Sequence, residues 1–375
     1  MAHALHDGYT DMIYVMLPVW QSEFALSYGL LALLRGLYAG SMAGLQVASG
    51  ALAKRFGGRI VLALGTALAA GGYCLAGFSG SLLGLCVALV LSGIGSSTQH
   101  PIASASVSRA YGKQARGPLG IYNFSGDLGK AALPAAVSLA LTLLSWRRVV
   151  WLVAAIGGVA ALLIALLASG DVNTEAEERS HASRPSNGRR GFSLLFAIGV
   201  LDSATRMGFL TFLPFLLKGK GASMPIIGLG MALVFLGGAA GKAACGWLGQ
   251  HIGVLPTVLG TEGGTAAAIM LTLWFPLIPS LIVLPLLGTM LNGTSSVLYG
   301  TVPELTTTDK AERAFALFYT GTIGAGAVAP VLYGCLGDAA GAFWAVVATA
   351  VTAAATLPLA MTLAPRLAKP AVSEF

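Results

Sequence analysis

The stretch "GPLGIYNFSGDLGKAALP" at residues 117–134 decides the fold, because its pattern returns in the other half of the chain. The second copy, "RAFALFYTGTIGAGAVAP", begins 196 residues later and covers residues 313–330. The sequence therefore predicts two structural repeats. The same offset pairs Pro134 with Pro330 at the ends of these stretches, and it relates three further pairs: Pro18 with Pro214, Gly50 with Gly246 and Gly57 with Gly253.

The composition places both repeats in a membrane. Of the 375 residues, 56% are hydrophobic and 10% are charged, and the mean hydropathy is +0.79. A soluble domain carries about 25% charged residues. Four charge-free stretches are each longer than the ~20 residues that a helix needs to cross the hydrocarbon core. These stretches are 60–108, 149–170, 263–303 and 339–365.

The predicted architecture is an all-α membrane protein with twelve spans in two six-helix bundles. Only helices and closed barrels satisfy the backbone in lipid, and no alternating barrel pattern occurs. We expect an N-terminal bundle at 1–169, a polar linker at 170–191 and a C-terminal bundle at 192–375. The expected spans are 3–24, 28–53, 59–78, 82–108, 116–143, 148–169, 192–217, 224–249, 254–276, 279–305, 312–336 and 340–364.

The basic residues predict the orientation. Fourteen Lys and Arg residues fall in the linker, the tail and the loops on one side, and four fall on the other side. By the positive-inside rule, both termini and the linker are cytoplasmic. The net charge of +7 then reflects topology, and no nucleic-acid partner is expected. We expect a monomer in the inner membrane without a cleavable leader.

The loop "GALAKRFGGR" at residues 50–59 resembles the signature of the major facilitator superfamily, and the resemblance extends over the whole chain. Lys54 stands where that family usually has an Asp, which helps to lock the closed cytoplasmic gate through an ion pair. Two parallel six-span repeats are also the plan of these transporters. The resemblance implies a gating role for six residues: Gly50, Lys54, Arg55, Gly57, Arg59 and Pro134.

Two further motifs resemble one subgroup. The His100–Pro101 pair in span four and the Gly-x-x-Gly-x-x-x-x-Pro element at 126–134 in span five are similar to the fosmidomycin-resistance group of drug exporters. The span-five element also resembles the motif of proton-coupled antiporters, although Leu133 replaces its usual glycine. The resemblance implies a proton-coupled exporter, but it does not identify the substrate.

Charged residues inside the spans are the candidate site. A charge at mid-bilayer costs roughly 2.5–3.5 kcal/mol on the insertion scale, so such a residue needs a partner or a watery cavity. In the resembled fold every span that carries one of these charges lines the cavity, except the span that holds Glu262. We expect the proton to be carried by Asp7, Asp11, Asp127 and Asp202, and the substrate to be bound by Arg35, Gln46, His100, Asn123, Lys130, Arg206 and Lys242.

Structural interpretations stand beside these roles. Two pairs could be purely structural ion pairs whose charges neutralise each other, because the members of each pair share one helix face. These pairs are Asp127 with Lys130 and Asp202 with Arg206. Arg35 could snorkel toward the outer surface. Asp7 and Asp11 could be solvated at the cytoplasmic end, and His100 could be a packing residue. These alternatives are left open by the sequence.

The predicted function is a secondary transporter that exports a small organic molecule with an anionic group in exchange for protons. Its partners are the solute, protons and the lipid bilayer. No motif for a cofactor, a metal or an enzyme is present, so we expect none of these. The alternatives are an importer of an organic anion, and a transporter-like sensor or lipid-handling protein.

Overall fold

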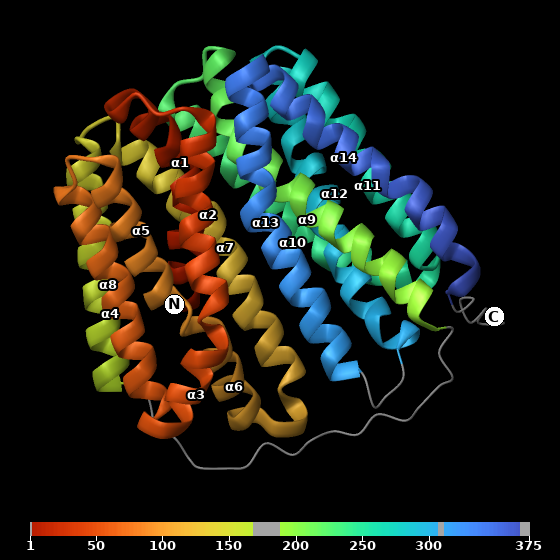
Figure 1. Ribbon diagram of the computed structural model, residues 1–375. Coiled ribbons are helices and arrows are strands. Elements are labelled where there is room, and N and C mark those ends of the chain that lie inside the picture. Colours follow the sequence, from red (N-terminus) through yellow and green to blue (C-terminus); the bar gives the residue numbers. More distant parts are fainter. Residues whose placement is uncertain (1, 168–187, 307–310, 368–375) are drawn as a thin grey trace. The chain divides into compact units, whose positions relative to one another are not determined.

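The computed structural model describes residues 2–167, 188–306 and 311–367, and within these ranges the regular structure is helical throughout (Figure 1). Most of the expected linker lies outside the described residues, although α9 already begins at Gly188. The first half contains α1 (Ala2–Phe24), α2 (Tyr28–Gly44), α3 (Gln46–Phe56), α4 (Gly58–Phe78), α5 (Leu82–Ser96), α6 (Gln99–Tyr111), α7 (Arg116–Ala140) and α8 (Trp146–Leu167). The second half contains α9 (Gly188–Gly219), α10 (Met224–His251), α11 (Val254–Trp274), α12 (Leu277–Thr301), α13 (Ala311–Ala340) and α14 (Ala342–Leu363).

The chain divides into two compact units. Unit 1 comprises residues 1–177 and 222–232, and unit 2 comprises residues 178–221 and 233–375. In unit 1, α1 packs on α7, and α4 packs on α5 and α8. In unit 2, α9 packs on α13 and α14, and α11 packs on α12 and α14. The start of α10 thus belongs to unit 1, whereas the sequence places all of it in the second bundle.

Most of the expected spans are long and apolar enough to cross a membrane. Nine helical segments among the described residues meet this requirement, and the bent pair α2 and α3 makes a tenth. The two expected spans that fall short are α1 and α7, which carry Asp7, Asp11, Asp127 and Lys130. The charged residues that lower the hydropathy of α1 and α7 are therefore residues of the candidate site.

Two predicted spans are interrupted. The span expected at 28–53 bends by 43° between α2 and α3. The span expected at 82–108 has a turn at Ser97 and Thr98, where α5 ends and α6 begins. Serine and threonine hydroxyls compete for backbone carbonyls, and Thr98 Oγ1 donates to Gly95 O at 3.0 Å. This competition accounts for the second break.

The two halves repeat in backbone conformation as well as in sequence. Gly57 precedes α4 with φ 88°, and Gly253 precedes α11 with φ 90°. Both values lie in the left-handed region that favours glycine. The offset of 196 residues thus relates two positions with the same conformational requirement.

Glycines bring α1 and α7 into close contact. A Cβ atom at Gly129 would lie 1.9 Å from Ala4 O, and one at Gly126 would lie 2.5 Å from Asp7 Oδ2. A side chain at either position would therefore separate the helices. The two glycines of the span-five motif have a packing role that positions Asp7 beside α7.

Candidate functional site

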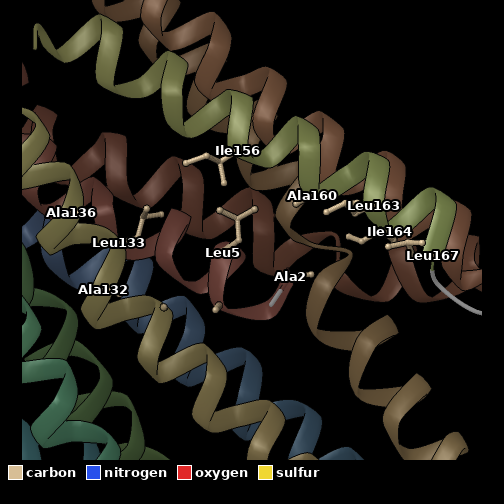
Figure 2. A pocket seen from close by; sticks show the side chains of 12 residues that line it. Ala2, Leu5, Ala132, Leu133, Ala136, Ile156, Ala160, Leu163, Ile164 and Leu167 are labelled. Atoms are coloured by element: carbon tan, nitrogen blue, oxygen red, sulfur yellow. The ribbon is translucent and has the colours of Figure 1, made fainter.

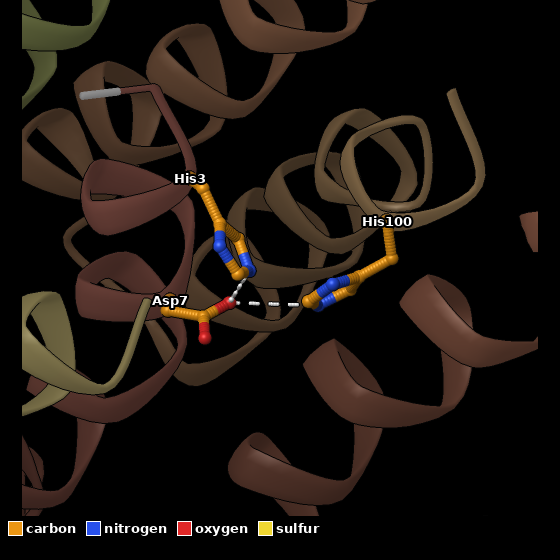
Figure 3. Close-up of side chains that lie close together, drawn as sticks. All are labelled: His3, Asp7 and His100. Carbon is orange, nitrogen blue, oxygen red and sulfur yellow. Dashed lines mark ion pairs between the residues drawn. The ribbon is translucent and has the colours of Figure 1, made fainter. Parts of the chain in front are cut away.

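Asp7 is the centre of a cluster of basic side chains in unit 1. Its Oδ1 lies 3.4 Å from His3 Nε2 and 3.5 Å from His100 Nε2, as Figure 3 shows. Its Oδ2 lies 3.2 Å from Lys130 Nζ. One carboxylate thus faces three basic groups from three helices: α1, α6 and α7.

His3 is held in place by Tyr122. Its Nδ1 lies 2.7 Å from Tyr122 O, and the two rings stack with centroids 3.8 Å apart. A carbonyl only accepts hydrogen bonds, so Nδ1 carries a hydrogen. Nε2 then attracts Asp7 only when it also carries a hydrogen. His3 was missed by the sequence argument, although its spacing of four residues from Asp7 is the usual spacing of helical side-chain pairs.

The cluster is partly accessible on its basic side. The exposed fraction is 7% for the Asp7 side chain, 28% for Lys130 and 39% for His100. The interpretation of Asp7 as a solvated residue is therefore wrong. The groups that a solute can reach here are an ammonium and an imidazole, and both can donate hydrogen bonds to an anion.

The expected pair of Asp127 and Lys130 is present, with 3.6 Å between Oδ1 and Nζ. Lys130 is nevertheless closer to Asp7 on the neighbouring helix. A purely structural ion pair would lie within α7 alone, whereas the Lys130 ammonium group lies between the carboxylates of Asp7 and Asp127. Lys130 therefore links α7 electrostatically to α1.

Arg35 is buried and pairs with Asp11. The Nη2 atom of Arg35 lies 3.9 Å from Asp11 Oδ1, and its guanidinium lies 5.0 Å from the centroid of the Tyr14 ring. Both members of the ion pair are buried. The snorkelling interpretation of Arg35 and the solvated interpretation of Asp11 are therefore wrong.

The other predicted residues of unit 1 lie at varied depths. Gln46 is half-buried at the start of α3, and Asn123 is exposed on α7. The basic residues of the loop motif, Lys54, Arg55 and Arg59, are exposed. Pro134 is buried inside α7, and Gly50 is half-buried in α3. The assigned gating and binding roles of these residues stay predictions.

In unit 2 the embedded charges gather around Asp202. Its carboxyl group interacts with Arg206, one helical turn further along α9, and with the carboxyl group of Glu262 on α11. Asp202 and Glu262 are buried, Arg206 is half-buried, and Lys242 is half-buried on α10. The sequence argument set Glu262 apart because its span does not line the cavity in the resembled fold. The structure adds an interaction of Glu262, on α11, with Asp202 on α9.

His3, Asp7 and His100 could also be considered for a metal ion. Their potential ligand atoms all lie within 4.8 Å of one another. Lys130 already places a positive charge on the same carboxylate. A divalent cation would face that charge, so an ion-pair cluster accounts better for the four residues together.

A separate cavity in unit 1 has an apolar lining. Its volume is about 650 Å³, and Figure 2 shows its walls, which belong to α1, α7 and α8. It offers no charged side chain to an anion. The residues that line it are Ala2, Ala4, Leu5, Gly129, Ala132, Leu133, Ala136, Ile156, Ala160, Leu163, Ile164 and Leu167.

The model of the Major Facilitator Superfamily matches residues 1–201, more than half of the chain. The chain belongs to this superfamily. It is therefore a multi-pass membrane transporter and not an enzyme. The narrower resemblance to the fosmidomycin-resistance group stays a prediction.

Relatives support the same fold and class. The chain is 26% identical over 361 residues to the "Probable sulfoacetate transporter SauU" of Cupriavidus necator, and the match covers 88% of this chain and 84% of that protein. A solved structure of a bacterial homologue of the human lysosomal transporter Spinster, in an inward-facing and occupied conformation, is similar with a TM-score of 0.82 and 16% identity. That match covers 98% of this chain and 95% of the other. The inward-facing and unoccupied structure gives a TM-score of 0.79, 16% identity and coverage of 99% and 97%.

Proposed function

We propose that this major facilitator is a proton-coupled secondary transporter that exports a small organic anion by alternating access. The observation that carries the proposal is the Asp7 cluster. Two basic side chains, Lys130 and His100, are partly exposed there, while the carboxylate that they share is buried. A solute carboxylate or sulfonate can accept hydrogen bonds from both groups without displacing Asp7.

The relative from Cupriavidus necator supports an anionic substrate class. Sulfoacetate, after which that relative is named, carries a sulfonate and a carboxylate on one short molecule. Charge-assisted hydrogen bonds to such groups are about twice as strong as neutral ones.

The embedded acids support proton coupling. Asp7, Asp11, Asp127 and Asp202 are all buried, and a buried carboxyl group that loses or gains a proton changes the charge of the transport pathway. Export is the proposed direction because the span-five element resembles the antiporter motif. Import of an organic anion on the same fold is the competing proposal.

Flux in liposomes tests the substrate, the coupling and the direction together. The purified protein is reconstituted, and sulfoacetate, a phosphonate, a simple carboxylate and a cationic drug are each supplied with and without a pH gradient. We expect an anion to move against its concentration gradient, in the direction opposite to the protons. Movement in the same direction as the protons would favour the importer. Transport of the cationic drug alone would contradict the anion site.

A further inference from the structure

The apolar cavity of unit 1 begins beyond a contact between α1 and α8. Tyr9 Oη donates a hydrogen bond to Val153 O at 2.8 Å, which holds the two helices together at this level. Every lining residue of α1 precedes Tyr9, and every lining residue of α8 follows Val153. The cavity therefore extends from this contact to the first turn of α1 and the last turn of α8 (Figure 2).

Small side chains leave this space unfilled. Of the twelve lining residues, five are alanine and one is glycine, so half of the lining extends by at most one carbon beyond the backbone. Atoms that line a void lose van der Waals contacts on that side. Helix association within lipid depends on such contacts, because lipid tails are as apolar as the side chains. An occupant of matching shape would therefore stabilise the packing of α8 on α1 and α7.

The lining also restricts the chemistry of the occupant. It consists of alanine, glycine, leucine and isoleucine, so no lining side chain carries a polar atom. A buried water molecule needs two to four polar partners. Neither water nor an anionic solute finds a side-chain partner here, and the occupant is therefore apolar.

The cavity is open on the outer side of α8. The side chains of Ile156, Leu163 and Leu167 are 54%, 48% and 75% exposed, and Ala132 is exposed on α7. No residue of α8 after Arg148 is charged. A charge-free helix of this length lies in the hydrocarbon core of a bilayer. The molecules that surround its exposed face are therefore lipids, and they can enter the cavity from the side.

The dimensions fit a lipid chain of one leaflet. The lining residues of α8 extend from Ile156 to Leu167, which is about 16 Å at 1.5 Å per residue. One leaflet is half of the ~30 Å hydrocarbon core, or about 15 Å. The volume of about 650 Å³ also suffices. An apolar cavity of about 150 Å³ holds a benzene ring, so this one has room for a chain of more than about twelve carbon atoms.

We propose that this cavity binds one acyl chain of a membrane phospholipid, which fills the space between α8 and the closely packed helices α1 and α7. The lipid belongs to the leaflet at the N-terminal end of α1, which is the cytoplasmic leaflet in the predicted orientation. The site is separate from the Asp7 cluster, because His3, Asp7, His100 and Lys130 are not among the lining residues. Its occupant is a structural lipid and not the transported solute.

Native mass spectrometry of the purified protein tests whether a lipid is bound. The protein in mild detergent receives palmitoyl-oleoyl phosphatidylglycerol. The variant Ala132→Leu/Ala160→Leu fills the cavity from two walls, and the matched control Ala155→Leu/Ala165→Leu adds the same groups at exposed positions of α8 outside the lining. Wild type and control should retain one phospholipid molecule, and the filled variant should lose it. Equal retention by all three proteins would overturn the proposal.

A second outcome would also overturn it. If wild type is a dimer without lipid, and the filled variant is a monomer, the cavity belongs to the contact with a second copy of the chain. Should the double variant fail to fold, Ala160→Leu replaces it with Ala155→Leu as its control.

Thermal unfolding separates the acyl chain from the head group. Dipalmitoyl-phosphatidylglycerol, dioctanoyl-phosphatidylglycerol and glycerol phosphate are each added to the protein in detergent. The midpoint of wild type and of the control should rise most with the palmitoyl chains, and that of the filled variant should not distinguish the two lipids. A rise with glycerol phosphate alone, or an equal chain-length dependence in the filled variant, would contradict an acyl-chain site. No transported solute is present, so failure of the proposed function leaves this test unaffected.

Discussion

Lys130 Nζ lies 3.2 Å from Asp7 Oδ2, closer than the 3.6 Å that separates it from Asp127 on its own helix. The ion pair that the sequence suggests within α7 is therefore one arm of a bridge to α1. This arrangement leaves one ammonium shared by two carboxylates and partly accessible. An anionic solute that binds Lys130 would share its ammonium group with both carboxylates.

Replacement of Lys130 should weaken binding of the solute. In Lys130→Gln, one charge-assisted hydrogen bond is lost, which is worth about 1.5–3 kcal/mol, or more than about tenfold in affinity. The dissociation constant of sulfoacetate is measured by calorimetry on purified protein. Lys54→Gln, an exposed residue of the loop motif, is the control and should bind as wild type does. Equal affinity of both variants would exclude Lys130 from the binding site.

The two partners of Lys130 should differ in their effect on stability. Asp7→Asn removes a charge that faces His3, His100 and Lys130, so we expect a loss of about 1–3 kcal/mol for the unpaired groups. Asp127→Asn leaves Lys130 paired with Asp7 and should cost less. Thermal unfolding in detergent measures both variants. The argument fails if Asp127→Asn is the less stable of the two.

Close packing of α1 on α7 should make Gly129 sensitive to substitution. In Gly129→Ala the new Cβ would meet Ala4 O at 1.9 Å, and overpacking of this kind costs about 1–3 kcal/mol. Gly120 is the matched control on the same helix, since nothing lies within 4 Å of a Cβ there. Gly120→Ala should keep or raise the midpoint of thermal unfolding, because alanine favours helix over glycine. A normal midpoint for Gly129→Ala would show that the two helices separate at little cost.

The distribution of basic residues predicts which loops are cytoplasmic. Single cysteines replace Ser145, between α7 and α8, and Ser186, in the expected linker, in a variant without Cys74, Cys86, Cys245 and Cys335. An impermeant thiol reagent added to intact cells should label position 145 and not position 186. Labelling at both positions from outside would overturn the predicted orientation.

Helix positions could be predicted from the sequence with small errors. The span expected at 254–276 is the helix Val254–Trp274, and the span expected at 59–78 is Gly58–Phe78. Lipid forces backbone hydrogen bonding within each span, so apolar length alone locates such helices. The turn at Ser97 and Thr98 was not predictable in this way. It depends on local hydroxyl contacts that hydropathy does not record.

The candidate site was less predictable than the fold. Pairs within one helix, such as Asp127 with Lys130, follow from spacing. Contacts between helices do not, so the proximity of Lys130 to Asp7 and of Glu262 to Asp202 was missed.

The glycine contact between α1 and α7 also bears on the mechanics of the transport cycle. With Ala4 directly against Gly129, no side chain lies between the backbones there to act as a compressible spacer. We therefore expect α1 and α7 to move together as one rigid unit. His3, Asp7 and Lys130, which lie on these two helices, then keep their positions relative to one another. If the cluster binds the solute as proposed, we expect a change in its affinity between the two sides of the membrane to originate in His100, which lies on α6 and not on these two helices.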